Sequence, residues 1–277
     1  MRFVICLLLS LVSCHLWARE GMDCWSSNKE SVTKRIPGFL IRVSPHHTRT
    51  GDTCRAQLID SGNKVVFSRS DSAFSIVLVD KDVNGDGIPD LVFEGFSGGA
   101  HCCWTYYVVS LGKTPGLIRK FENERGASFI LNKSTGRIEI ATMDGAFDYF
   151  DFLSHGETPF PLVYLSLEGK SLTDISKTHL AGYDREIKKA KTQLDSKGMG
   201  QFRSVAKVDD LASGDFNRHM AAVVLQIAFA YLYSGRKELA HRALKEMWPT
   251  FDQERIWKLI LLTRSQGILR YTRQKAA

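Results

Sequence analysis

The chain has 277 residues, of which 44% are hydrophobic and 24% are charged, with a formal net charge of +7. This length supports one large domain or two modest ones, and no segment after the first 18 residues is long and apolar enough for a membrane helix. The positive charge is concentrated in residues 182–277, which contain 18 Lys and Arg against 10 Asp and Glu. A basic surface of this kind suits an anionic partner such as lipid headgroups or an envelope polymer.

The first 18 residues have the pattern of a secretory signal peptide. One arginine precedes an apolar run from Phe3 to Val12, and small and polar residues follow. Two processing routes fit: cleavage after Ala18, or a bacterial lipobox at residues 11–14 that would make Cys14 a lipidated first residue. We therefore expect an exported protein of bacterial type, periplasmic or extracellular, which touches a membrane only through a possible lipid anchor. Export argues against nucleic acid as the partner.

Four cysteines remain after the signal peptide, namely Cys24, Cys54, Cys102 and Cys103. An even number in an oxidising compartment predicts disulfides, with three possible pairings. A bond between the neighbours Cys102 and Cys103 would close a small ring far from preferred disulfide geometry. We therefore expect Cys24 and Cys54 each to bond one member of the Cys102–Cys103 pair.

The middle of the chain alternates between short β-prone runs and turn residues. Gly, Pro, Asn and Asp recur every 8–12 residues, which predicts an antiparallel assembly. Strands are expected at 38–43, 55–59, 64–68, 74–79, 90–94, 105–111, 117–121, 129–131, 137–142, 161–167 and 171–175.

A metal-ligand pattern lies between two of these strands. Asp82, Asn84, Asp86 and Asp90 occupy positions 1, 3, 5 and 9 of a D-x-N-x-D-G-x-x-D loop, and the backbone carbonyl of Ile88 falls at position 7. Calcium is a hard cation that takes six to eight oxygen ligands, so alternate residues of a tight loop can supply them. The alternative is a plain hairpin, since Asn-Gly and Asp-Gly favour tight turns, but that does not explain Asp82 and Asp90.

The loop differs from an EF-hand, because position 12 is Phe93 and the flanking runs are strands. With Asp90-Leu91-Val92 after it, the loop resembles the calcium repeats of FG-GAP/VCBS-type, integrin-like proteins. The resemblance covers one repeat of some 15 residues. It implies that Asp82, Asn84, Asp86 and Asp90 donate side-chain oxygens to Ca²⁺ in a strand–loop–strand unit.

A second acidic run, residues 144–151, contains Asp144, Asp148 and Asp151 among aromatic residues. Paired carboxylates at a suitable separation hydrolyse glycosides. This run supports an alternative in which the protein is an envelope hydrolase or another carbohydrate-acting enzyme. Strand residues near a loop explain the same pattern without catalysis, and the sequence leaves enzymatic activity open, with a non-enzymatic protein favoured.

The C-terminal part has helical periodicity. Helices are expected at 183–194, 219–233 and 236–247, with a fourth capped by Asp252, and Asp215 is the expected N-cap of the 219–233 helix. Residues 228–244 resemble one tetratricopeptide-type helical pair.

Together these patterns predict an α+β protein with a signal peptide at 1–18, a β-rich domain at 19–176, a linker or helix at 177–200 and an α-helical domain at 201–277. The β-rich domain would be a sandwich or partial propeller. The leading functional hypothesis is an exported protein with a structural calcium ion and a partner in the cell envelope, either a protein or a polymer. An adhesion or surface-interaction module is the third alternative.

Overall fold

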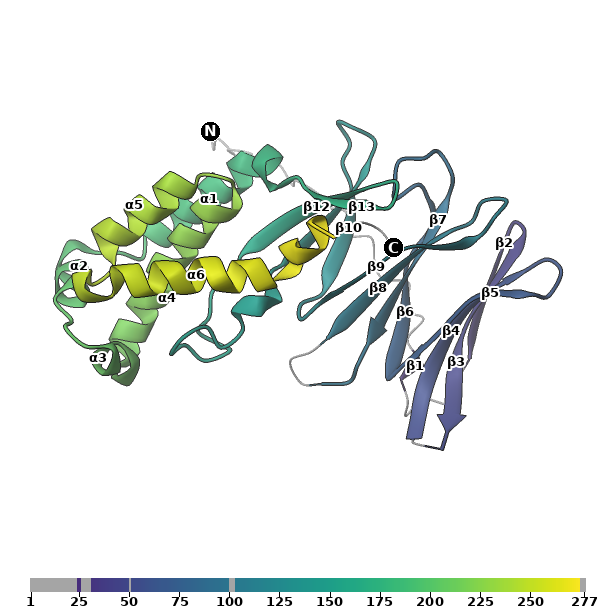
Figure 1. Cartoon of the computed structure of the whole chain (residues 1–277), viewed down its shortest axis with the longest axis horizontal. Helices are drawn as coiled ribbons and strands as arrows, with labels where there is room; N and C mark the ends of the chain where they lie inside the picture. Colours follow the sequence, from purple (N-terminus) through teal and green to yellow (C-terminus); the bar gives the residue numbers. More distant parts are fainter. Residues whose placement is uncertain (1–23, 26–30, 50, 100–102, 275–277) are drawn as a thin grey trace, which may run out of the picture.

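The computed structural model describes residues 24–25, 31–49, 51–99 and 103–274. The predicted signal peptide, Cys14 and Cys102 lie outside the described residues. In the described part, antiparallel sheets occupy the chain up to about residue 175, and helices follow. Figure 1 shows the sheets at one end of an elongated molecule and the helices at the other. This arrangement confirms the α+β class predicted from the sequence.

The strands form three antiparallel sheets. The first contains four strands in sequential order: β2 (Val32–Ile36), β3 (Phe39–Thr48), β4 (Gly51–Asp60) and β5 (Val65–Asp71). The second has the order β1 (Cys24–Trp25), β6 (Ala73–Lys81), β7 (Asp90–Phe96), β8 (Trp104–Ser110) and β9 (Gly116–Asn123). The third contains β10 (Ala127–Leu131), β11 (Ile138–Met143), β12 (Leu162–Glu168) and β13 (Ser171–Asp174). Every expected strand is present, whereas β1 and β2 were not predicted.

The second sheet is buried on both faces. Because successive side chains of a strand point to opposite sides of the sheet, its strands contribute to two hydrophobic clusters. Leu91 and Phe93 of β7 belong to a cluster with residues of β3, β4 and β5. Val92, between them in sequence, belongs to a separate cluster that continues into the third sheet and the helices. The stacked rings of Phe67 and Phe93, with centroids 5.4 Å apart, join the first sheet to the second.

The helical region is built around one apolar helix. The helices are α1 (Leu180–Lys191), α2 (Ser196–Arg203), α3 (Val208–Ser213), α4 (Asp215–Tyr233), α5 (Lys237–Met247) and α6 (Gln253–Gln266). Helix α4 is buried along most of its length and contacts α1, α2, α3 and α5. Its N-cap is Gly214 and Asp215 is its first residue, so the cap prediction was wrong by one position. Helices α2 and α3 were not predicted.

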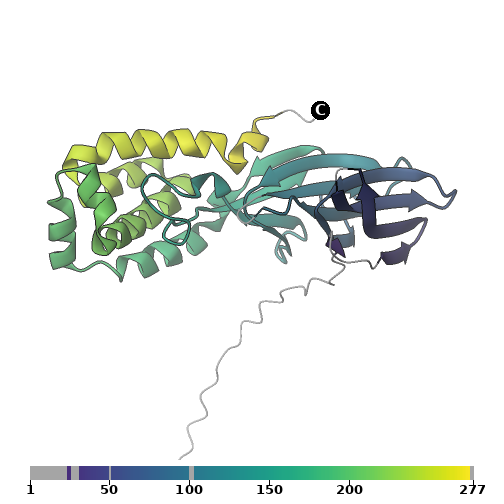
Figure 2. The ribbon, with the colours of Figure 1, turned by 90° about the horizontal axis from the view of Figure 1, so that it is seen from below.

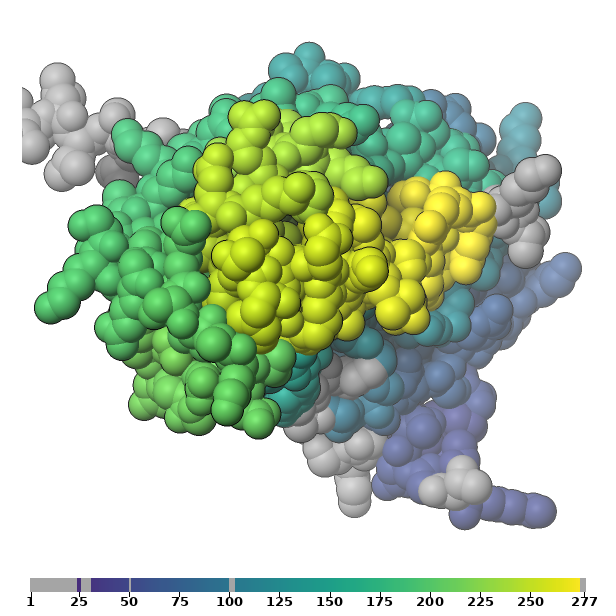
Figure 3. Space-filling model, turned by 60° about the vertical axis from the view of Figure 1, so that its left-hand side comes forward, coloured from purple at the N-terminus to yellow at the C-terminus, as the bar shows by residue number. Residues whose placement is uncertain are grey.

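The C-terminal end returns to the sheets. The short helix η4 (Ile268–Thr272) contacts β9 and β13, and the side view of Figure 2 shows α6 running from the far helices toward the sheets. Figure 3 shows the same C-terminal segment, in yellow, lying against the β region. One hydrophobic cluster therefore runs from β7 through the third sheet into the helices. None of the helices in the described residues has both the length and the apolar character needed to cross a membrane.

The disulfide in the described residues joins Cys24 to Cys54, with Cα atoms 5.8 Å apart. This bond overturns both predicted pairings of these cysteines. The reason is tertiary: β1 pairs with β6 at the edge of the second sheet, and this places Cys24 beside Cys54 of β4 in the core between two sheets. Cys103 is also disulfide-bonded. A disulfide is consistent with an oxidising compartment outside the cytoplasm.

Candidate metal-binding loop and the acidic segment after β11

The predicted metal loop connects β6 to β7, and the backbone before it is irregular. The pairing of β6 with β7 shifts register within Ile76–Leu78 and again within Val79–Lys81. Such bulges bend a strand and increase its twist. Gly85 and Gly87 then adopt φ values of 76° and 79°, a left-handed conformation that costs little only for glycine. The chain therefore reverses tightly at the position that the motif predicts.

The first three predicted ligands, Asp82, Asn84 and Asp86, make a set of short-range hydrogen bonds within the loop. Asp82 Oδ1 accepts the N–H of Gly85 at 2.6 Å, and Asp82 Oδ2 accepts that of Gly87 at 2.9 Å. Asp86 Oδ1 accepts the N–H of Ile88 at 2.8 Å. The side-chain amide of Asn84 donates to Asp86 Oδ2 at 3.0 Å. These short-range bonds are typical of Asx turns and shape the loop locally.

Asp90 differs from the other loop acids because it is completely buried. Its Oδ2 accepts the N–H of Val83 at 2.8 Å, whereas its Oδ1 is buried with no hydrogen-bond partner. Burial raises the pKa of Asp90 to about 6; hydrogen bonds from the backbone oppose this rise, and the negative charges of Asp86 and Asp82 add to it. A buried carboxylate oxygen without a partner is costly, because it has lost its hydration.

The predicted ligands have the oxygen atoms that a hard cation needs, but in this structure those atoms are not arranged around a common point. Across the described residues, no group of three or more His, Cys, Asp or Glu side chains is arranged to hold a metal ion. The carboxylates of Asp82 and Asp86 are turned toward backbone N–H groups instead. All predicted ligands are nevertheless oxygens, the type that calcium prefers. The unpaired Oδ1 of Asp90 is the atom that a cation would satisfy.

The loop also contacts the third sheet, through residues that the motif does not include. The N–H of Gly169, in the β12–β13 turn, donates to the carbonyl of Asn84 at 2.9 Å. The guanidinium of Arg137 lies over Gly85, and its Nη1 is 3.7 Å from Oε1 of Glu168. No spacing in the sequence connects Arg137 or Gly169 to the loop, because the two sheets meet only in the tertiary structure. The loop thus joins the second sheet to the third.

Asp144, the first residue of the other acidic segment, is completely buried. Its Oδ2 accepts the hydroxyl of Tyr233 in α4 at 2.6 Å, and its Oδ1 accepts the N–H of Ile268 at 3.1 Å. Burial raises the pKa of Asp144, and these hydrogen bonds oppose the rise. A Cβ on Gly267 would collide with the carboxylate, so glycine is required there. Asp144 therefore clamps two helical segments to the end of β11.

The other two acids of this segment have different partners. Asp148 Oδ1 lies 2.7 Å from Nδ1 of His155. Asp151 forms a bidentate pair with Arg255 of α6, at 2.9 and 2.7 Å, and Arg255 also binds Asp252. The structure thus places Asp144, Asp148 and Asp151 in one segment, but it gives each a separate set of protein partners.

Comparisons with known proteins add no family to this description. No protein-family model, curated protein or solved structure significantly matches the chain.

Proposed function

We propose that this chain is an exported protein that binds a structural calcium ion in the β6–β7 loop. The ligands would be the side chains of Asp82, Asn84, Asp86 and Asp90 and the backbone carbonyl of Ile88. The observation that carries the proposal is the buried Asp90 carboxylate, whose Oδ1 lacks a partner inside a loop of oxygen donors. A divalent cation would offset two of the three negative charges carried by Asp82, Asp86 and Asp90.

The position of the loop supports a structural role for the ion. The loop contacts the β12–β13 turn through the hydrogen bond from Gly169 to Asn84 and lies under Arg137. An ion that orders the loop would therefore also stabilise the junction between the second and third sheets. The disulfide between Cys24 and Cys54 supports export, since such bonds persist in oxidising compartments. We further propose that the basic helical region, rather than the loop, meets a partner in the cell envelope.

Thermal unfolding with excess EGTA or with calcium chloride tests the calcium proposal. A ligand that binds only the folded state stabilises it by about 2.7 kcal/mol at a hundredfold excess over its dissociation constant. For a chain of this size we expect calcium to raise the melting temperature by roughly 5–10 °C. Titration calorimetry should show one calcium site, with weaker binding of magnesium, which demands stricter octahedral geometry.

Asp86→Asn is the matched test variant, because asparagine keeps an oxygen for the N–H of Ile88 while it removes the charge. The control is Asp209→Asn, an equal charge change at an exposed position of α3. We expect Asp86→Asn to abolish the calcium-dependent shift and Asp209→Asn to retain it. Identical melting of the wild-type protein in EGTA and in calcium, with no heat of binding, would refute the proposal.

A further inference from the structure

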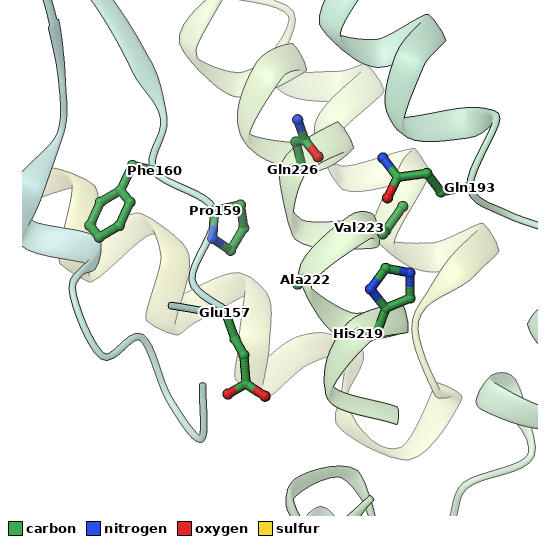
Figure 4. A pocket seen from close by; sticks show the side chains of 8 residues that line it. All are labelled: Glu157, Pro159, Phe160, Gln193, His219, Ala222, Val223 and Gln226. Carbon is green, nitrogen blue, oxygen red and sulfur yellow. The ribbon is translucent and has the colours of Figure 1, made fainter. Parts of the chain in front are cut away.

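A cavity of about 250 Å³ lies beside α4, remote in sequence from the metal loop. Figure 4 shows Glu157, Pro159 and Phe160 on the loop at one side, with residues of α4 and Gln193 at the other. The lining from α4 is His219, Ala222, Val223 and Gln226, which are spaced by three or four residues and so share one helix face. The cavity is therefore formed where the segment before β12 meets the helical region.

Two polar groups of this cavity, Gln193 and His219, are exposed to solvent. Their side chains make no hydrogen bond or ion pair with other described residues, so water is the only partner that a ligand would displace from them. Gln226 makes a long bond of 3.4 Å to Glu186 from its amide nitrogen, which leaves its amide oxygen available. Carboxamides and a neutral imidazole each donate and accept hydrogen bonds. A purely apolar ligand that covered these groups would displace their water without replacing its hydrogen bonds, at a cost in binding free energy.

The lining provides no uncompensated charge for a strongly ionic ligand. It contains no Lys or Arg, and its one carboxylate, Glu157, accepts a bond from Arg218 Nε at 2.7 Å. The hydroxyl of Ser154 and the guanidinium of Arg218 lower the pKa of Glu157 to about 2. Glu157 is thus a carboxylate whose counter-ion is already in place. A cationic ligand would have to compete with Arg218 for this carboxylate, and an anionic ligand would find no Lys or Arg in the lining.

The rest of the lining is apolar. Pro159, Ala222 and Val223 provide carbon surface on both sides of the cavity. The ring of Phe160 is held by the guanidinium of Arg125, 3.6 Å from the ring centroid, and so serves to anchor the loop. A small ligand would find carbon surface next to groups that both donate and accept hydrogen bonds.

From these observations we propose that the cavity beside α4 binds a neutral sugar residue. Hydroxyl groups donate and accept hydrogen bonds in the same way as Gln193, Gln226 and His219 do, and the C–H face of a sugar ring suits carbon walls. The volume is suited to a single small ring rather than to a long chain. This site is separate from the calcium loop and does not depend on it.

Saturation-transfer and ¹H–¹⁵N NMR titrations with glucose, mannose and N-acetylglucosamine test this proposal. The full-length mature protein is used, with glucuronate as an anionic probe and the tripeptide Gly-Pro-Gly as a peptide probe. At least one neutral sugar should shift the imidazole resonances of His219 saturably, with an affinity in the millimolar range. His219→Ala and Gln226→Ala should each weaken binding about tenfold.

The control variant is His47→Ala, an exposed histidine in the β3–β4 hairpin whose loss should leave sugar binding unchanged. Three outcomes would overturn the proposal: no neutral sugar perturbs His219, binding is unaffected by both cavity variants, or glucuronate or the tripeptide binds more tightly than every neutral sugar. Retained melting temperatures of His219→Ala and Gln226→Ala separate loss of binding from loss of folding.

Discussion

The two acidic segments use the same residue type in opposite ways. In the β6–β7 loop, Asp82 and Asp86 accept hydrogen bonds from backbone groups at most five residues away. In the segment after β11, Asp144 bonds to residues 89 and 124 positions away, and Asp151 to one 104 positions away. The first arrangement concentrates negative charge in one turn. The second spreads it among partners that hold the helices to the sheets.

This comparison shows that the role of an acidic cluster depends on whether its hydrogen-bond partners are local or distant in the sequence. A carboxylate whose partners are local N–H groups keeps its negative charge, so a cluster of them suits a cation. A carboxylate hydrogen-bonded to a distant tyrosine, or paired with a distant arginine that also compensates its charge, acts as a clamp between elements. We therefore expect metal to bind only at the loop, and substitutions after β11 to affect folding independently of metal.

The largest effect is expected for Asp144→Ala. This change leaves the hydroxyl of Tyr233 and the N–H of Ile268 buried without an acceptor, and each unsatisfied group costs about 1–3 kcal/mol. We expect a loss of about 3 kcal/mol or more in the free energy of unfolding, measured by urea denaturation. Tyr233→Phe, which removes only the hydroxyl, should cost less. The loss of stability should be equal in EGTA and in calcium. A loss that depends on calcium would show that Asp144 does not act independently of the metal loop.

Asp90→Asn should change the free energy of unfolding in opposite directions in the absence and in the presence of calcium. In EGTA the substitution removes a buried charge and keeps an oxygen for the N–H of Val83, so stability should be unchanged or higher by about 1 kcal/mol. In saturating calcium the same variant should be less stable than the wild type, by roughly 2–3 kcal/mol, because a ligand is lost. Paired urea denaturation curves in the two solutions measure this reversal. Equal effects in both would show that Asp90 does not bind the ion.

Arg255→Ala tests the second clamp of the acidic segment. The guanidinium holds Asp151 in a bidentate pair and also contacts the buried carboxylate of Asp252, and these partners raise its pKa. Because the Arg255 side chain is 41% exposed, solvent screens the pair, and we expect a loss of only about 1–2 kcal/mol. Arg255→Lys should recover part of it, since lysine keeps the charge without the bidentate geometry. Full recovery by lysine would show that charge alone matters.

The smallest expected effect is the contribution of Glu157 to the loss of protein stability at low pH. Hydrogen bonds from Ser154 and Arg218 lower the pKa of Glu157 from 4.5 to about 2, so the pair contributes stability above pH 4.5 that is lost as the pH falls toward 2. We expect Glu157→Gln to reduce stability slightly at neutral pH and to flatten its decline across that range. Thermal melts between those pH values measure the slope. An unchanged slope would show that Arg218 does not stabilise the folded state through this carboxylate.

Local patterns were sufficient for the strands β3 to β13, the tight turn at Gly85 and Gly87, and the helices α1, α4, α5 and α6. Period-2 alternation, turn residues and apolar helical stripes act over a few residues, so they can be read directly. The order of the loop ligands is equally local. The short helices α2 and α3 and the strands β1 and β2 were missed because their apolar residues are too few to give a period.

Contacts between distant residues were decided only by the tertiary structure. The pairing of Cys24 with Cys54 depends on β1 joining the edge of the second sheet, and the role of Asp144 depends on α4 and the segment at Ile268 meeting the end of β11. The cavity beside α4 likewise exists because residues from three separate segments meet. The sequence determined the local shapes and which oxygen-bearing side chains lie in the loop. Packing determined which charges are compensated, because burial and partners arise only when distant segments come together.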